Sequence, residues 1–144
     1  MAEVTTVAQL VTTDPVTVQR DQPVSEVYHM LKYAPFHHVP VMEHDHPVGM
    51  ISSVDVLRLA YDIDGFDERD MAEMLDYHFT IDDAMSTDLR TVQATATITD
   101  AAELLSDGMA HSLLVVDDEG RLEGIITTTD LIRHLARVGS PQPT

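Results

Sequence analysis

Cysteine is absent from this sequence of 144 residues. Disulfide bonds, thiolate nucleophiles and thiolate metal ligands are therefore excluded. No apolar run approaches the length of a membrane span, and Met1 is followed by a mixed polar stretch instead of the basic start and apolar run of a signal peptide. We therefore expect a cytoplasmic protein with no membrane partner.

Positive charge is scarce as well. The chain has 8 Lys and Arg residues against 25 Asp and Glu residues, Lys32 is its one lysine, and its formal net charge is −17. Such a chain would repel phosphate backbones, so no nucleic-acid partner is expected. An acidic balance of this size raises solubility and self-repulsion and is known in salt-adapted proteins. Any anion site must be built locally from backbone N–H groups, hydroxyls, histidines and a few arginines.

The common catalytic signatures are missing too. The chain has no Gly-x-Ser-x-Gly, no Gly-rich P-loop with Lys-Ser/Thr and no His-Glu-x-x-His. The acid pairs Asp82-Asp83 and Asp117-Asp118 fall in predicted capping or turn positions, where we expect ordinary solvated acids. No enzyme activity is expected.

One segment, His44-Asp45-His46, contains side chains that bind first-row metals. It falls in a predicted hairpin turn, where adjacent residues rarely reach one ion together, and it lacks the spacing of a zinc motif. A solvated turn is therefore favoured, and no metal site is predicted. A metal-responsive protein that uses these histidines is the weaker alternative.

An internal duplication organises the chain. A shift of 74 residues places residues 7–43 on residues 81–117, and after one extra residue in the second turn the shift becomes 75. The residue types then match over nearly the whole length. We predict the following organisation: a first repeat at 1–62, an acidic and helical linker at 63–80, a second repeat at 81–138 and a tail at 139–144.

Both repeats have the same predicted order of a short strand, a helix, a hairpin and a second helix. In the first repeat these are residues 17–19, a helix with Val27, Met30, Leu31 and Ala34 on its apolar face, strands 38–42 and 48–51, and a helix from 53 to 61. In the second repeat the short strand is at residues 91–93, and Thr99 caps the following helix, whose apolar face carries Ala101, Leu104, Leu105 and Met109. The hairpin strands are at 113–116 and 122–126, joined by a turn at 117–120. The last helix runs from Thr127 or Thr128 to about Val138.

The linker also has helical spacing, with Met71, Met74, Leu75 and His78 on one side. Amphipathic surface helices are common, so a connecting helix that packs on the body is favoured. A dimer face is the alternative.

Each repeat ends in Gly-apolar-apolar-Ser/Thr-x-x-Asp, at residues 49–55 and 124–130. A strand that runs into a helix N-terminus leaves N–H groups that favour an anion, and an Asp in the first turn can accept hydrogen bonds from hydroxyls. A phosphate beside a diol describes a ribonucleotide. The same pattern is also a capping box. Because it occurs twice, at equivalent places, ligand contact is favoured, and it is compatible with capping.

The order of elements, the Val39-Pro40-Val41 strand and the two Gly-apolar-apolar-Ser/Thr-x-x-Asp motifs resemble the CBS domain. Two in tandem, from about residue 4 to 138, resemble a CBS pair, or Bateman module. The resemblance implies an α+β fold of two tandem β-α-β-β-α repeats that pack sheet to sheet with pseudo-two-fold symmetry. It also implies two clefts for an adenosine-containing ligand (AMP, ADP or ATP, with S-adenosylmethionine possible) and a homodimer.

The resemblance implies ligand-binding residues in both repeats: Asp55, Ser52, Ser53, Asp130, Thr127, Thr128, Thr13, Asp14, Pro15, Thr87, Asp88, His37, His38, Val39, Pro40, His111, Ser112 and Leu113. Arginine, frequent in the family just before the hairpin strand, is replaced there by His37, His38 and His111. These histidines are either solvated or phosphate-binding, and in the second case affinity would depend on pH. Leu114 replaces the Pro of the first repeat, so the clefts should not be equivalent.

We therefore expect a regulatory module that senses an adenine nucleotide, needs no cofactor and passes its signal to an effector protein of unknown identity. A dimeric interaction module with vestigial clefts is the alternative.

Overall fold

The computed structural model describes residues 5–33, 38–63 and 68–139. The chain divides into two compact units: Val16–Leu89 is the central unit, and Met1–Pro15 with Arg90–Thr144 is the terminal unit. The units do not coincide with the sequence repeats, because the segment that precedes the first repeat's short strand packs in the unit that holds the second repeat.

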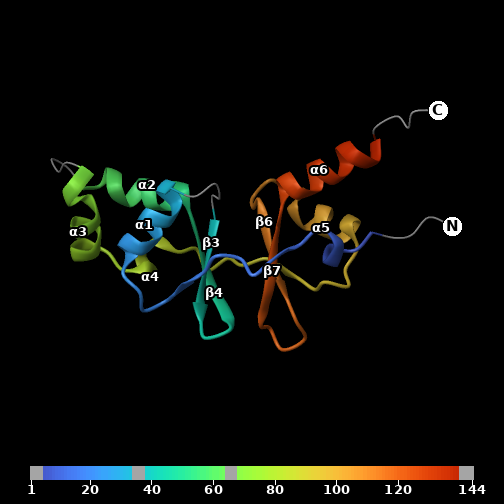
Figure 1. Cartoon of the computed structure of the whole chain (residues 1–144), viewed down its shortest axis with the longest axis horizontal. Helices are drawn as coiled ribbons and strands as arrows, with labels where there is room; N and C mark the ends of the chain where they lie inside the picture. Colours follow the sequence, from blue (N-terminus) through green and yellow to red (C-terminus); the bar gives the residue numbers. More distant parts are fainter. Residues whose placement is uncertain (1–4, 34–37, 64–67, 140–144) are drawn as a thin grey trace. The chain divides into compact units, whose positions relative to one another are not determined.

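The central unit is a three-stranded sheet with helices on one side (Figure 1). Its elements are β2 (Val18–Gln19), α1 (Val24–Tyr33), β3 (His38–Glu43), β4 (His46–Ser52), α2 (Ser53–Tyr61), α3 (Glu68–His78) and α4 (Ile81–Ala84). Strand β3 lies in the middle, parallel to β2 and antiparallel to β4. The predicted hairpin and the predicted 53–61 helix are confirmed.

The terminal unit is a four-stranded sheet in the order β1-β7-β6-β5. Its elements are the 3₁₀ helix η1 (Val7–Gln9), β1 (Thr12–Thr13), β5 (Thr91–Val92), α5 (Ile98–Leu105), β6 (Ser112–Val116), β7 (Leu122–Thr127) and α6 (Thr128–Gly139). Figure 1 shows α5 and α6 on the same side of the β6–β7 hairpin. The predicted second hairpin and last helix are confirmed.

Each unit has its own apolar core, built by the alternation of side chains along the central strand. In the central unit Val39, Val41 and Ile51 are fully buried, and helices α1 to α4 complete the core. Their counterparts in the terminal unit are Leu113, Val115 and Ile126. Equivalent residues of the two repeats therefore fill two separate clusters.

The linker helix α3 belongs to the central unit. Leu75 is fully buried in that core and Met71 packs against it. Asp76 fixes the orientation of α3, since its carboxylate accepts hydrogen bonds from the N–H and the hydroxyl of Ser25 in α1, at 2.8 and 2.6 Å. His78 is exposed. The arrangement matches a connecting helix that packs on the body.

The predicted start of the second repeat's first helix is wrong. Helix α5 begins at Ile98 and is capped by Thr97, whose hydroxyl accepts a hydrogen bond from the N–H of Asp100 at 3.1 Å while the Asp100 carboxylate accepts one from the N–H of Thr97. Thr99 lies inside the helix. The reciprocal box satisfies two N–H groups and sets the boundary two residues earlier. The predicted apolar face is also too long, because Met109 lies beyond the helix and is 80% exposed.

The segments that lead into the two repeats are exchanged between the units. Thr12 and Thr13 pair with Ile125 and Gly124 as strand β1 of the terminal unit. In the central unit Ser86, which precedes the second repeat's short strand, forms the equivalent antiparallel bridge with Met50.

The motif glycines lie at these two bridges. A Cβ on Gly124 would stand 2.5 Å from the Thr12 carbonyl oxygen, and a Cβ on Gly49 would stand 2.5 Å from the sulfur of Met85. Gly124 is therefore needed for the backbone of β1 to approach β7 closely, while a side chain at Gly49 would displace the flexible side chain of Met85.

In the part of the chain that the structure describes, the helices are all too short or too polar to traverse a bilayer.

Candidate ligand-binding sites at the strand ends

The first motif forms where β4 ends at Ser52 and α2 begins at Ser53. The Asp55 carboxylate turns back to the strand end, and its Oδ2 accepts hydrogen bonds from the Ser52 N–H at 2.8 Å and from the Ser52 hydroxyl at 2.9 Å. The Ser52 hydroxyl in turn accepts one from the Asp55 N–H at 3.2 Å. The capping box predicted as one role of this motif is confirmed.

The second motif repeats this geometry almost unchanged. Asp130 Oδ2 accepts from the Thr127 N–H at 2.8 Å and from the Thr127 hydroxyl at 3.0 Å, and the Asp130 N–H donates to that hydroxyl at 3.2 Å. Both carboxylates are half-buried. Among the described residues, none donates a hydrogen bond to Oδ1 of Asp55 or Asp130. One oxygen of each carboxylate thus fixes the strand–helix corner, and the other can accept a hydroxyl.

The strand register brings a polar partner to each corner. His38 lies opposite Ser52 across β3 and β4, and Ser112 lies opposite Thr127 across β6 and β7. Directly opposed residues of antiparallel strands project from the same face of the sheet. Each strand end therefore carries a hydroxyl with a neighbouring imidazole or a second hydroxyl, beside the capping Asp.

Three of the predicted contact residues are buried instead. Val39 and Leu113 are 0% exposed, and both belong to the cores. Pro40 is also buried. Their side chains serve packing, so only their backbone atoms remain as candidate ligand contacts.

The residues at the helix starts differ between the units. In the terminal unit the N–H and hydroxyl of Thr128 donate to the His111 carbonyl oxygen at 2.9 and 3.2 Å, while the rest of His111 is exposed. In the central unit Ser53 begins α2 and is half-buried. His37, the counterpart of His111, lies outside the described residues.

The predicted loop contacts Thr13, Asp14 and Pro15 belong to the terminal unit. Thr13 lies opposite Gly124, three residues before Thr127, and the chain continues away from that strand end because β1 and β7 are antiparallel. Asp14 has a positive φ of 50°, a conformation that Asp tolerates better than most residues. Thr87 and Asp88 belong to the central unit and follow the Ser86–Met50 bridge.

Two arginines that are not among the predicted contact residues line a hollow with Asp130. A hollow of about 580 Å³ in the terminal unit is lined by Gln9, Leu10, Asp130, Arg133, Ala136 and Arg137. The family resemblance implies cations just before the hairpin strand, whereas these two arginines come from α6. The signal that could have found Arg133 is a repeated Asp-x-x-Arg, at residues 55–58 and 130–133.

A larger hollow, of about 940 Å³, lies in the central unit. Arg20 lines it, held by both oxygens of Asp82 at 2.8 and 3.1 Å and by Glu43 at 3.0 Å. Hydrogen bonds from Arg20 lower the pKa of Asp82, and the two carboxylates raise the pKa of Arg20. None of the eighteen predicted contact residues lines this hollow, so it is separate from the Asp55 corner.

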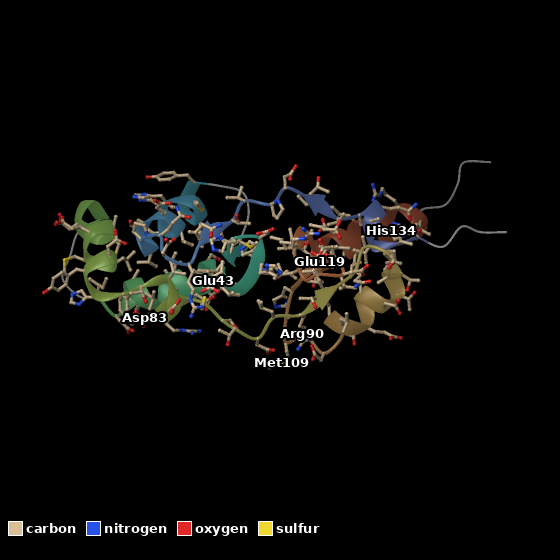
Figure 2. The ribbon with its side chains drawn as sticks, turned by 90° about the horizontal axis from the view of Figure 1, so that it is seen from below. Glu43, Asp83, Arg90, Met109, Glu119 and His134 are labelled. Carbon is tan, nitrogen blue, oxygen red and sulfur yellow. The ribbon has the colours of Figure 1, made fainter. Side chains whose placement is uncertain are left out.

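Two further ion pairs brace the terminal unit. The guanidinium of Arg90 donates to the two carboxylate oxygens of Asp107 at 2.9 and 3.0 Å, and these hydrogen bonds lower the pKa of Asp107. A hydrogen bond from the Met109 N–H lowers the same pKa further. Figure 2 shows Arg90 and Met109 beside each other.

The Asp117 carboxylate accepts hydrogen bonds from the backbone N–H and the side chain of Arg121 in the hairpin turn, and these bonds lower the pKa of Asp117. The expectation that Asp82 and Asp117 are ordinary solvated acids is therefore wrong, because each is paired with an arginine.

Within residues 5–33, 38–63 and 68–139, no group of three or more His, Asp or Glu side chains is arranged to hold a metal ion. His44 has a positive φ of 56° in the turn between β3 and β4.

The sequence profile of the CBS domain matches residues 7–62 and 81–137. This chain belongs to the CBS domain family. A CBS domain-containing protein of Dictyostelium discoideum is 30% identical over 140 residues, which is 95% of each chain. The two matched segments agree with the two repeats predicted from the 74-residue duplication.

Other curated relatives are much longer than the part they share with this chain. A homoserine O-acetyltransferase of Methanobrevibacter ruminantium is 40% identical over 57 residues, 40% of this chain and 12% of that protein. An inosine-5′-monophosphate dehydrogenase of Chlorobaculum parvum is 27% identical over 118 residues, 82% of this chain and 22% of that protein. The match spans at most 28% of the length of the first three curated relatives.

Solved CBS-pair proteins share the fold. CBSX2 from Arabidopsis thaliana superposes with a TM-score of 0.76 at 23% identity, over 97% of this chain and 100% of that one. A complex of CBSX2 with AMP gives the same TM-score over 94% and 99% of the two chains. The CBS domain pair of protein MJ0100, in complex with 5′-methylthioadenosine and S-adenosyl-L-methionine, gives 0.74 at 23% identity, with 94% and 99% coverage. The predicted family and the α+β class are confirmed.

Proposed function

We propose that this protein is a regulatory module that binds an adenosine-containing ligand at its strand-end corners and passes the signal to a partner protein. The observation that carries the proposal is the duplicated corner. Asp55 and Asp130 each use Oδ2 to cap a helix, and each keeps Oδ1 for an outside donor.

The chemistry of the corners suits a ribonucleotide. A ribose diol offers two hydroxyl donors to a carboxylate oxygen, and the first N–H groups of α2 and α6 favour a phosphate. His38 and Ser112 lie close enough in register to add polar contacts. The CBSX2 complex with AMP and the MJ0100 complex with S-adenosyl-L-methionine support AMP, ADP or ATP as ligand, with S-adenosylmethionine as an alternative.

We assign no reaction to the chain. It matches only 12% and 22% of the lengths of the two enzymes named above, so their activities do not transfer to it. Binding would shift the population of conformations that a partner recognises. A cytoplasmic site of action fits a chain without cysteine.

Isothermal titration of AMP, ADP, ATP and S-adenosylmethionine tests the proposal. Asp55→Ala and Asp130→Ala should each weaken binding at one corner by about tenfold or more, the equivalent of a lost charge-assisted hydrogen bond. Both also break a cap, so the matched control is Asp100→Ala, which breaks the box at Thr97 away from the corners. Absence of binding by all four ligands, or equal weakening in the control, would contradict the proposal.

A second candidate function is a dimeric interaction module. Two helices leave apolar side chains exposed along one stripe each. In α6 these are Ile132, Leu135 and Val138, at 59%, 69% and 66% exposure, and in α2 they are Val54, Leu57 and Tyr61, at 59%, 68% and 86%. Exposed apolar rows of this kind often mark contacts with another chain. A dimer whose melting temperature no nucleotide changes would favour this alternative.

A further inference from the structure

The hollow around Arg20 in the central unit has an apolar floor and an acidic rim. Its volume is about 940 Å³, and its apolar lining includes the buried side chains of Val24 and Met42 and the half-buried ring of Phe79. Four exposed carboxylates line it as well: Asp21, Glu43, Asp76 and Asp82. Arg20 is the one arginine or lysine in this lining, so negative charge is in excess. A side chain with a long apolar stem and a cationic head matches such a surface.

The second repeat closes the equivalent place. With the 74-residue shift, Arg20 corresponds to Ala94 and Asp82 to Ala8. In the terminal unit the backbones of these two alanines are joined, since the N–H of Ala8 donates to the Ala94 carbonyl oxygen at 3.0 Å. In the described part of the central unit no backbone hydrogen bond joins α4 to residues 20–22, and the Arg20–Asp82 ion pair spans this place instead. The hollow is therefore a departure from the duplication.

The rim already holds one guanidinium group, that of Arg20. Both oxygens of Asp82 accept hydrogen bonds from it at 2.8 and 3.1 Å, and Glu43 Oε1 accepts one at 3.0 Å. These charge-assisted bonds fix two of the four carboxylates in place. Among the described residues, none donates a hydrogen bond to Glu43 Oε2 or to the Asp21 carboxylate. Acceptors therefore remain for a second cation.

Charge decides which kind of segment the hollow can accept. The chain carries a net charge of −17, so it repels an acidic partner and attracts a basic one before contact is made. The stem of a basic side chain can cover Phe79 and Met42 while its charged head stays at the rim. Arginine suits the open acceptors better than lysine, because its planar fork donates to two oxygens at once.

We propose that the hollow around Arg20 is a docking site for the partner protein, and that its occupant is an arginine-bearing basic segment of that partner. The arginine head binds Asp21 and the open oxygen of Glu43, and its stem lies on Phe79. The inference rests on the partner in the proposed function. It adds the chemistry of that partner and a place for it that shares no residue with the predicted ligand contacts.

A defined peptide tests the docking site. The probe is a short peptide of alternating Gly and Arg, and the matched probe carries citrulline, a neutral isostere, in place of each Arg. Isothermal titration at about 0.15 M salt limits attraction by distant charges. Only the Arg peptide should bind, and NMR should show shifts of the amide resonances of residues 20–22 and 43–44. Equal binding of the citrulline peptide, or shifts confined to other residues, overturns the inference.

Variants of the rim locate the contact. Asp21→Asn and Glu43→Gln should each weaken binding of the Arg peptide about threefold to tenfold, as the loss of one partly exposed charged contact predicts. The matched control is Glu73→Gln on the exposed surface of α3, which makes the same change in net charge outside the hollow. Equal weakening in the control, or none in the two rim variants, overturns the inference.

Arg20→Gln should have the opposite effect. It removes the cation that the rim already holds, so Asp82 and Glu43 become available and the Arg peptide should bind about threefold tighter or more. Arg121→Gln makes the same change in net charge in the hairpin turn of the terminal unit and should change the affinity less. An equal gain in both variants, or no gain in Arg20→Gln, overturns the inference.

Titration of AMP beside the Arg peptide separates this inference from the proposed function. If the Arg peptide binds at the hollow and no adenosine compound binds the chain, the ligand part of the proposed function fails and the docking site stands. If adenosine compounds bind and the Arg peptide does not, the ligand part stands and the docking site fails. Absence of both responses overturns both.

Discussion

The carbonyl oxygen of Thr12 lies 2.5 Å from the point where a Cβ on Gly124 would stand. Real Cβ atoms essentially never approach another heavy atom within 3.0 Å. The N-terminal segment can therefore join the sheet beside β7 only because the second motif begins with glycine. The residue that opens the second Gly-apolar-apolar-Ser/Thr-x-x-Asp motif is thus also the place where strand β1 attaches.

We predict that Gly124→Ala destabilises the protein by about 1–3 kcal/mol, the usual cost of forcing an extra methyl group into a packed site. The clash is with backbone, which cannot rotate away. Gly49→Ala is the matched control, because its Cβ would meet the flexible side chain of Met85 and should cost less. Urea denaturation of both variants measures the difference. Equal midpoints for the two would contradict the backbone clash.

Much of the fold could be predicted from the sequence, because apolar alternation and the 74-residue duplication determine where strands and helices fall. The β3–β4 hairpin and the β6–β7 hairpin follow from that pattern. The exchange of the leading segments could not be predicted, since the Thr12–Ile125 pair joins residues far apart in the chain through one short strand. Arg137, which lines the hollow beside Asp130, was not singled out for a related reason: it lies on an exposed helix face, where no sequence pattern marks it.

Thr97→Ala should destabilise the protein by about 1 kcal/mol, since a capping hydroxyl is lost at the start of α5. Thr99→Ala changes the same residue type two positions later, inside the helix, where alanine is the better helix former. It should leave stability unchanged or raise it slightly. Thermal unfolding of the two variants checks the boundary. A larger loss from Thr99→Ala would restore Thr99 as the cap.

The two low carboxyl pKa values of the terminal unit have different first causes, which NMR titration can separate. The Arg90 side chain is the largest cause for Asp107, so Arg90→Gln should return most of its pKa toward the ordinary value. For Asp117 the largest cause is the backbone N–H of Arg121. Arg121→Gln keeps that N–H, so the pKa of Asp117 should stay low. A full return of Asp117 in this variant would contradict the turn geometry.

The same shifts set a direction for stability against pH. Asp82, Asp107 and Asp117 all have folded-state pKa values below the ordinary 3.8. Their contribution to stability is therefore present above about pH 4 and is lost as the pH falls through the lower folded values. Arg20→Gln should flatten the acid limb of the stability curve, because it removes the main cause of the low Asp82 pKa. Urea midpoints between pH 2 and 5 measure this slope, and an unchanged slope would contradict the pairing.

The exposed row on α6 leads to a prediction about assembly. If Leu135, 69% exposed, lies in a contact between two copies, Leu135→Glu should convert dimers to monomers, because it puts a charge into an apolar interface. Met109→Glu is the control, since Met109 is 80% exposed but lies in the turn after α5, outside the row. Sedimentation equilibrium over a range of concentrations gives the association constant of each variant. A monomeric wild type, or a loss of dimer in Met109→Glu and not in Leu135→Glu, would rule out α6 as the dimer contact.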